Sequence, residues 1–151
     1  MKLQEILAKL KDCGYKITPQ RQEIVSLLMR ENRHMTVEDI YGKIADRYPN
    51  LSLDTVYRNV GILERLNILT KSDFGDGKGR YRIKESDGHR HHLICLKCGC
   101  SEEMDFCPLD YIDHREIKDK NFSIKKHNFE IFGYCSECVQ KEGQPVAERN
   151  K

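Results

Sequence analysis

Residues His89–Cys100 read HRHHLICLKCGC, and a distant stretch, His127–Cys138, reads HNFEIFGYCSEC. Each stretch contains a Cys-x-x-Cys pair that histidine precedes at the spacing of a β-strand. Together the pairs supply four thiolates, the ligand set of a tetrahedral structural zinc site. The sequence therefore predicts a four-cysteine zinc site that joins two distant segments. Its predicted ligands are Cys95, Cys98, Cys135 and Cys138.

Redox exchange between dithiols is the alternative chemistry for two cysteine pairs. Neither pair opens a helix after a strand, as thioredoxin-type motifs do, so zinc is the favoured interpretation. Of the remaining cysteines, Cys13 is interpreted as a small buried hydrophobe. Cys100 and Cys107 are left open between inert residues and an additional soft ligand or redox-sensitive thiol.

The histidines beside the first cysteine pair predict a second metal site. His89 and His91 are two positions apart, so on a strand they point to the same side, and His92 points to the other. With Asp110 and His127, the first two histidines complete a four-ligand set. Nitrogen and carboxylate ligands are harder than thiolates and suit an exchangeable Zn²⁺, Fe²⁺ or Mn²⁺ ion.

A third candidate set consists of His34, His92 and Glu103. Because His34 lies in the N-terminal half of the chain, a metal held by this set would bridge the two halves.

The N-terminal half has the element order of a winged helix-turn-helix. Helices are predicted over 2–13, from Thr18-Pro19 to about residue 30, from Thr36 to Pro49, and over 52–66. Residues 68–83 follow as a hairpin around the glycine-rich turn 75–79. The fourth helix would read the DNA major groove, and Lys78–Arg82 would form the wing.

A polar stripe on the fourth helix supports this interpretation. Arg58 and Arg65 lie opposite the apolar face, and arginine contacts guanine edges or phosphates. Thr55 and Tyr57 lie near the N-terminal end of the same helix. A solvated charged face is the alternative, and the hairpin directly after the helix favours DNA binding.

Charge divides the chain in the same way. Residues 1–84 carry 16 Lys and Arg against 11 Asp and Glu, whereas residues 85–151 carry 10 against 13. The predicted organisation is α+β: a DNA-binding domain over 1–84, a hinge over 85–88, a metal-binding domain over 89–138 and a disordered tail over 139–151. Within 89–138, a helix is expected from Pro108 to about Asp119 and a strand over Phe122–Phe132.

No apolar run approaches the roughly 18 residues of a membrane span, and the N-terminus lacks a signal-peptide pattern, so a cytoplasmic protein without a membrane partner is expected.

Four motifs in this order resemble the ferric uptake regulator (Fur) family. They are TPQR at 18–21, DTVYRN at 54–59, the histidine-rich strand with CxxCG, and H-x-F-E-I-x-G-x-C-x-x-C at the end, and the resemblance spans Leu3 to Cys138. Members are dimeric, metal-dependent bacterial repressors that bind palindromic operators. The resemblance implies a winged-helix domain followed by a small α/β dimerisation domain.

The resemblance also implies roles for individual residues. Lys16, Arg21, Tyr57 and Arg58 match DNA-contacting positions. The CxxC cysteines match a structural zinc site. The set His89, His91, Asp110 and His127 matches the metal site of the dimerisation domain, and the set His34, His92 and Glu103 matches an inter-domain sensing site.

The sensing site departs from the iron-sensor pattern. Arg82 stands at or near the usual acidic ligand, with Glu85 as a candidate replacement, and Arg90 stands where histidine is expected. MDFCPLD and HNFEIFGYC look closer to the zinc uptake regulators (Zur) of the family. A zinc-responsive repressor of metal-homeostasis genes is therefore the prediction, with iron-responsive and peroxide- or manganese-responsive repressors as alternatives.

Two other classes of function are weighed against this one. A zinc hydrolase would need an open coordination position and a general base, for which Glu102 or Glu103 is available. The chain has no HExxH or deaminase signature, so an enzyme is not expected. A zinc module that binds a protein partner would lack the steep salt dependence of binding to duplex DNA.

Overall fold

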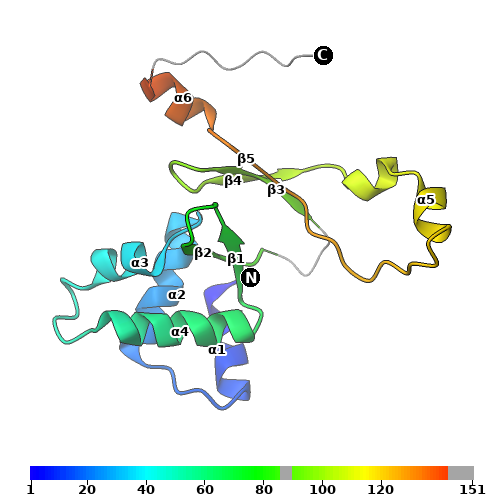
Figure 1. Cartoon of the computed structure of the whole chain (residues 1–151). Coiled ribbons are helices and arrows are strands. Elements are labelled where there is room, and N and C mark those ends of the chain that lie inside the picture. The colour runs from blue at the N-terminus through cyan, green and yellow to red at the C-terminus, as the bar shows by residue number, and fades with distance from the viewer. Residues whose placement is uncertain (86–89, 143–151) are drawn as a thin grey trace. The chain divides into compact units, whose positions relative to one another are not determined.

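The computed structural model describes residues 1–85 and 90–142, which form two compact units (Figure 1). The first unit comprises Met1–Asp87 and the second Gly88–Lys151. Among the described residues, no helix combines the length and apolar character needed to cross a bilayer.

The first unit contains four helices followed by an antiparallel hairpin (Figure 1). Its elements are α1 (Leu3–Asp12), α2 (Pro19–Glu31), α3 (Val37–Ile44), α4 (Leu53–Arg65), β1 (Leu69–Asp73) and β2 (Gly79–Ile83). An isolated bridge adds the loop before α3 to the hairpin, because Met35 and Tyr81 exchange backbone hydrogen bonds of 3.0 and 2.8 Å. The predicted order of elements is observed.

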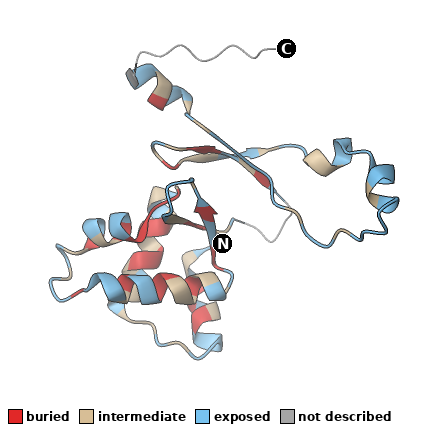
Figure 2. Cartoon of the chain, viewed as in Figure 1, coloured by how far each residue is buried: buried red, intermediate tan, exposed pale blue. Residues whose placement is uncertain are grey.

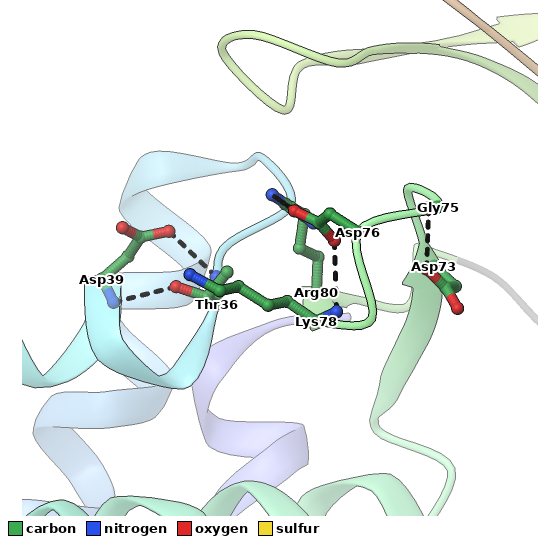
Figure 3. Close-up of polar contacts among 7 residues, drawn as sticks. All are labelled: Thr36, Asp39, Asp73, Gly75, Asp76, Lys78 and Arg80. Carbon is green, nitrogen blue, oxygen red and sulfur yellow. Dashed lines mark hydrogen bonds and ion pairs between the residues drawn. The ribbon is translucent and has the colours of Figure 1, made fainter.

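Side-chain caps fix where these helices begin. Thr18 Oγ1 accepts a hydrogen bond from the Arg21 N–H at 3.2 Å, and proline occupies the first turn of α2. Thr36 and Asp39 form a reciprocal capping box at the start of α3, with distances of 3.0 and 3.1 Å (Figure 3). Ser52 caps α4 in the same way as Thr18 caps α2.

The apolar faces of the helices and the hairpin meet in a single core (Figure 2). In α4 the core-facing residues are Val56, Val60 and Leu63, as the sequence pattern predicts. Ile24, Leu28 and the other buried residues of α2 pack into the same cluster. Burial of this kind stabilises a domain by roughly 1.5–3 kcal/mol for each large apolar side chain.

The second unit is built on a three-stranded sheet of order β4–β3–β5. Its elements are β3 (His91–Cys95), β4 (Ser101–Met104), the 3₁₀-helix η1 (Pro108–Tyr111), α5 (His114–Lys118), β5 (Glu130–Gly133) and α6 (Ser136–Glu142). β3 runs antiparallel to β4 and parallel to β5, with Leu93 opposite Ile131. The predicted α+β class is therefore confirmed.

Three details of the second unit differ from the sequence-based expectation. The helix expected from Pro108 to Asp119 is split into η1 and α5, because Asp113 has an extended backbone and its side chain caps α5 by accepting from the Arg115 N–H at 3.0 Å. The strand expected over Phe122–Phe132 is confined to β5. Residues 139–142, expected to be disordered, belong to α6. Residues 86–88 of the expected hinge and 143–151 of the expected tail lie outside the described part.

Candidate metal centres and DNA-binding surface

The four cysteines of the two CxxC pairs come together in the second unit. One sulfur from each lies within 4.8 Å of the others, and Cys98 Sγ is 3.8 Å from Cys135 Sγ. Cys95 ends β3 and Cys135 follows β5, and the parallel pairing of these strands places both at the same end of the sheet. The expectation that neither pair opens a helix after a strand is wrong for the second pair, because α6 begins at Ser136. Zinc is instead favoured over dithiol exchange by the convergence of all four sulfurs. Gly99, with a φ of 74°, permits the tight turn after Cys98.

Backbone groups stabilise negative charge in this four-cysteine cluster. Burial alone would raise the pKa of the Cys95 thiol, but backbone N–H groups of Cys98, Cys135 and Lys97 outweigh it and lower this pKa to about 6. Burial and the neighbouring thiols raise the pKa of Cys138 to about 12. Four thiols so close together cannot all ionise without a compensating cation, and a tetrahedral set of thiolates fits Zn²⁺.

A second cluster consists of His91, Cys107 and His127, whose ligand atoms also lie within 4.8 Å of one another. His127 Nε2 is 3.2 Å from His91 Nε2 and 3.4 Å from Cys107 Sγ. His91 begins β3 and is 3% exposed. Two imidazoles and a thiol in this arrangement are able to hold a divalent metal ion.

A backbone contact fixes the tautomer of His91. Its Nδ1 lies 3.2 Å from the Phe129 carbonyl oxygen, which can only accept, so Nδ1 carries the proton. Nε2 is then the basic nitrogen, and it faces His127. Metal-binding histidines are commonly oriented by a hydrogen bond of this kind.

Asp110 and His89, the two other residues of the predicted four-ligand set, are not part of this cluster as the structure describes it. Asp110 does not join the three-residue cluster, but it lines a cavity of about 440 Å³ together with His91 and Cys107. His89 lies outside the described residues. The sequence left the role of Cys107 open. Its position three residues before the predicted ligand Asp110 was the one feature of the sequence that could have indicated a place near the metal.

The third predicted set divides between the two units, each of which is described by itself. His34 is buried in the first unit, with its Nε2 3.3 Å from Ser72 Oγ. His92 and Glu103 are opposite one another in the β3–β4 ladder, and Glu103 forms an ion pair with Arg90. This set therefore stays a prediction.

Arg82, the other departure from the iron-sensor pattern, is buried in the first unit. Its guanidinium donates to Asn32 Oδ1 at 3.2 Å and forms an ion pair with Glu85. The positive charge at this position is therefore compensated within the first unit.

Two predicted DNA-contacting residues are exposed near the beginning of α4. The Tyr57 hydroxyl donates to Glu38 on α3 at 2.8 Å, and Arg58 forms an ion pair with Asp54 one turn earlier. Both acidic partners restrain side chains that would have to be redirected towards a phosphate or a base.

The other three predicted contacts lie around the start of α2 and α4. Arg21 Nε donates to the buried Asn59 Oδ1 at 2.8 Å, and its guanidinium also donates to the Lys16 carbonyl oxygen. Lys16 is exposed, and Thr55 Oγ1 is 2.8 Å from Ser52 Oγ. Arg21 therefore links α2 to α4.

The hairpin turn is held in shape by its own polar side chains (Figure 3). Arg80 donates to both carboxylate oxygens of Asp76, at 2.8 and 2.7 Å, and covers the Phe74 ring at 4.3 Å. The hydrogen bond with Arg80 holds the pKa of Asp76 well below its usual range. The Lys78 N–H also donates to Asp76, at 3.1 Å, and the Lys78 side chain stays exposed. The wing therefore presents a preformed turn with a basic residue.

A helical DNA-binding unit joined to a thiolate-rich β-unit defines a metal-binding transcription regulator. The family described as the Ferric uptake regulator family matches residues 12–132, and the chain belongs to this family. The protein is a metal-responsive transcriptional repressor and not an enzyme.

Three relatives define the similarity further. The chain is 35% identical over 144 residues to the ferric uptake regulation protein of Bacillus subtilis (strain 168), covering 93% of this chain and 97% of the relative. It is 34% identical over 140 residues to the peroxide operon regulator of the same strain, covering 93% and 95%. Among solved structures, the ferric uptake regulator of Helicobacter pylori matches with a TM-score of 0.71 and 30% identity over 91% of this chain and 94% of that one. These relatives favour the iron- and peroxide-responsive alternatives over the zinc-responsive prediction.

Proposed function

We propose that the protein is a homodimeric repressor that binds a palindromic operator when a regulatory metal occupies the second unit. The observation that carries this proposal is the His91–Cys107–His127 cluster, a ligand set separate from the four-cysteine cluster. Two centres of different ligand chemistry permit one permanent and one exchangeable ion. The H. pylori relative, which has three functional metal-binding sites, is consistent with more than one ion per chain.

The four-cysteine cluster is assigned to structural Zn²⁺. Four thiolates leave no open coordination position, so the ion has a structural role. The cluster connects the end of β3 with the start of α6, two segments that share few buried apolar residues. The proposed domains are 1–84 for DNA binding and 89–138 for metal binding and dimerisation, joined at 85–88.

DNA contact is assigned to α4, the start of α2 and the wing. Tyr57, Arg58 and Lys16 are exposed and able to reach phosphates or base edges. Arg21 and Thr55 lie beside them and orient the ends of α2 and α4. Operator DNA is the shared partner of Fur-family regulators.

The partner surface for a second copy is assigned to the exposed apolar face of the sheet. Leu93 and Ile131 are neighbours in the β3–β5 register and are 42% and 43% exposed. With Tyr134 they line a hollow of about 360 Å³. An exposed apolar patch on a small unit favours association, because dimerisation removes it from water.

Two candidates remain for the regulatory metal. The names of the relatives support an iron-responsive or peroxide-responsive repressor, and this is the first candidate. Zinc is the second, because the cluster contains a thiol in addition to imidazoles. Mn²⁺ is the least favoured candidate, because it has the lowest affinity for such donors among the first-row divalent metals.

Control of DNA binding follows from differential affinity. His91, on β3, and His127, before β5, come from separate segments, so holding one ion between them restricts the geometry of the second unit. If the DNA-competent dimer holds the ion more tightly than other arrangements, metal and operator each strengthen binding of the other.

Operator affinity of the full chain tests the proposal. Protein that retains its tightly bound zinc is mixed with promoter DNA of metal-uptake genes, and anisotropy is measured without added metal and with Fe²⁺ under anaerobic conditions, Mn²⁺ or Zn²⁺. The cognate metal should tighten binding by at least about fivefold, with a steep salt dependence. Equal affinity with and without every metal contradicts the proposal.

A pair of histidine variants locates the effect. His91→Ala should remain a zinc-containing dimer that has lost the response to added metal. His114→Ala, at an exposed position on α5, is the matched control and should respond like wild type. A full response in His91→Ala removes the cluster from the mechanism.

A further inference from the structure

We infer that Cys107 supplies a thiolate ligand to the regulatory centre and that this thiolate gives the centre a preference for Zn²⁺ over Mn²⁺. The inference rests on the proposed function, in which the His91–Cys107–His127 cluster holds the regulatory ion. It adds a ligand that was not assigned from the sequence and names the class of metal that this ligand selects.

The arrangement of the three side chains is the first argument. Cys107 Sγ lies 3.4 Å from His127 Nε2, which in turn lies 3.2 Å from His91 Nε2. Zinc–sulfur bonds of about 2.3 Å and zinc–nitrogen bonds of about 2.0–2.1 Å place donor atoms about 3.3–3.8 Å apart around one tetrahedral ion. The spacing already present therefore needs only small shifts to accommodate an ion.

The local backbone explains why the sulfur and not the Asp110 carboxylate occupies this place. Cys107 has an extended backbone, with φ −101° and ψ 123°, immediately before Pro108. The chain then turns into η1, where the Asp110 N–H donates to the Cys107 carbonyl oxygen at 3.1 Å. Cys107 thus lies at the entrance of the turn, and Asp110 lies one turn further on, along the wall of the same cavity.

The tautomer of His91 is consistent with ligation. The Phe129 carbonyl fixes the proton of His91 on Nδ1, so the lone pair that can bind a metal is on Nε2. Two imidazoles and one thiolate are three protein ligands, and catalytic zinc sites likewise use three protein ligands and keep a fourth position open. Asp105 and Asp110 line the same cavity, and their carboxylates are the acidic groups in that lining that could supply a fourth ligand.

Ligand softness determines the selectivity. Thiolate favours Zn²⁺ and Co²⁺, whereas carboxylate favours Mn²⁺ and other hard ions. A thiolate at position 107 therefore moves the centre away from the nitrogen-and-carboxylate chemistry predicted from His89, His91, Asp110 and His127. The names of the relatives support an iron- or peroxide-responsive repressor, and the thiolate adds a preference for Zn²⁺ over Mn²⁺ at the same centre.

Cobalt spectroscopy tests for the sulfur–metal bond directly. Full-length protein with its tightly bound zinc retained is titrated with Co²⁺, and zinc is quantified throughout to verify that the four-cysteine cluster is not exchanged. Wild type should develop a near-ultraviolet sulfur-to-cobalt charge-transfer band with the added equivalent. Cys107→Ser should lack this band. The matched variant Cys13→Ser should retain it, because Cys13 is exposed in the first unit and not buried as the sequence predicted.

Competition between Zn²⁺ and Mn²⁺ tests the selectivity. Cys107→Asp should lower the preference for Zn²⁺ over Mn²⁺ by at least about tenfold. Mutation of a residue that only hydrogen-bonds a metal ligand already changes metal affinity by about 10–100-fold. Asp110→Asn should change it less. An unchanged charge-transfer band in Cys107→Ser, or an unchanged preference in Cys107→Asp, overturns the inference.

Operator binding separates this inference from the proposed function. If Cys107→Ser responds to metal like wild type and wild type shows no sulfur-to-cobalt band, the repressor mechanism stands and the thiolate ligand is wrong. If wild type shows the band but no metal changes operator affinity, the ligand is correct and the regulatory role is wrong.

Discussion

In the first unit, 19 buried apolar residues pack into one cluster, whereas the buried apolar residues in the described part of the second unit are Ile94, Cys95 and Cys138. The second unit also exposes large apolar side chains such as Tyr111, Phe122 and Tyr134. Figure 2 shows this contrast, with buried residues concentrated in α1–α4 and sparse around α5 and β5.

The contrast teaches that the two units obtain their stability from different sources. Burial of apolar surface is sufficient for a small helical domain. A unit with so few buried side chains needs metal ions, a partner chain or both. Variants in the two units should therefore fail in different ways, and the expected effects are largest where metal replaces a core.

Loss of the four-cysteine site should have the largest effect. Binding of structural zinc is worth about 10–16 kcal/mol in small zinc domains. Cys95→Ser should therefore lose zinc and unfold β3, β4 and β5, while amides of α1–α4 stay protected in hydrogen exchange. Persistent protection of the sheet in zinc-free protein would show that the second unit has another source of stability.

Removal of a core side chain should be the next largest effect. Leu28 is fully buried in α2. Leu28→Ala should lower the free energy of unfolding by about 2–5 kcal/mol. The loss should be confined to the first unit, so zinc content stays unchanged in urea titrations followed by both circular dichroism and zinc release. Leu53→Ala, at an exposed position on α4, is the control.

Loss of the buried hydrogen bonds of Asn59 should be intermediate. Its amide donates to the Thr55 carbonyl oxygen at 2.8 Å and accepts from Arg21 Nε at 2.8 Å. Asn59→Ala should destabilise the first unit by about 1–3 kcal/mol, because buried partners are left without their bonds. Denaturant midpoints measure this change, and the exposed Asn50→Ala serves as control. A midpoint equal to wild type would show that water replaces the amide.

The smallest effect should come from Glu31 on α2. A hydrogen bond from Lys43 is the main cause that lowers its pKa below 4.5, and Arg33 contributes. A carboxyl group whose pKa is lowered on folding stabilises the folded state above its unfolded pKa, and this contribution disappears as the pH falls through the lower folded value. Glu31→Gln should cost less than about 1 kcal/mol at neutral pH.

The difference between wild type and Glu31→Gln should therefore shrink when unfolding is measured at pH values below about 4.5. Glu64→Gln on α4 is the matched control. A difference that grows on acidification would contradict the assigned direction.

The features that could be predicted from the sequence are those that depend on residues close together in the chain or on strictly spaced ligands. The starts of α2, α3 and α4 follow from Thr18, Thr36 and Ser52, because capping depends on residues within one turn. The four-cysteine cluster follows from two spaced pairs with a strict geometric demand. The place of Cys107 beside His127 could not be read in the same way, since it depends on how η1 leaves β4 and approaches a distant segment. The late start of β5 within the expected strand likewise reflects tertiary pairing with β3, not alternation.

The parallel pairing of β3 and β5 also sets an order in time. The four-cysteine cluster lies at the carboxyl ends of these strands, and His91 begins β3, four residues and roughly 13 Å away. His127 comes before β5, at the same end as His91. An ion bound by the cysteines fixes the register that brings the two histidines together. The proposed structural zinc should therefore bind before the proposed regulatory ion, and chains made during zinc starvation are expected not to respond to the regulatory metal until zinc returns.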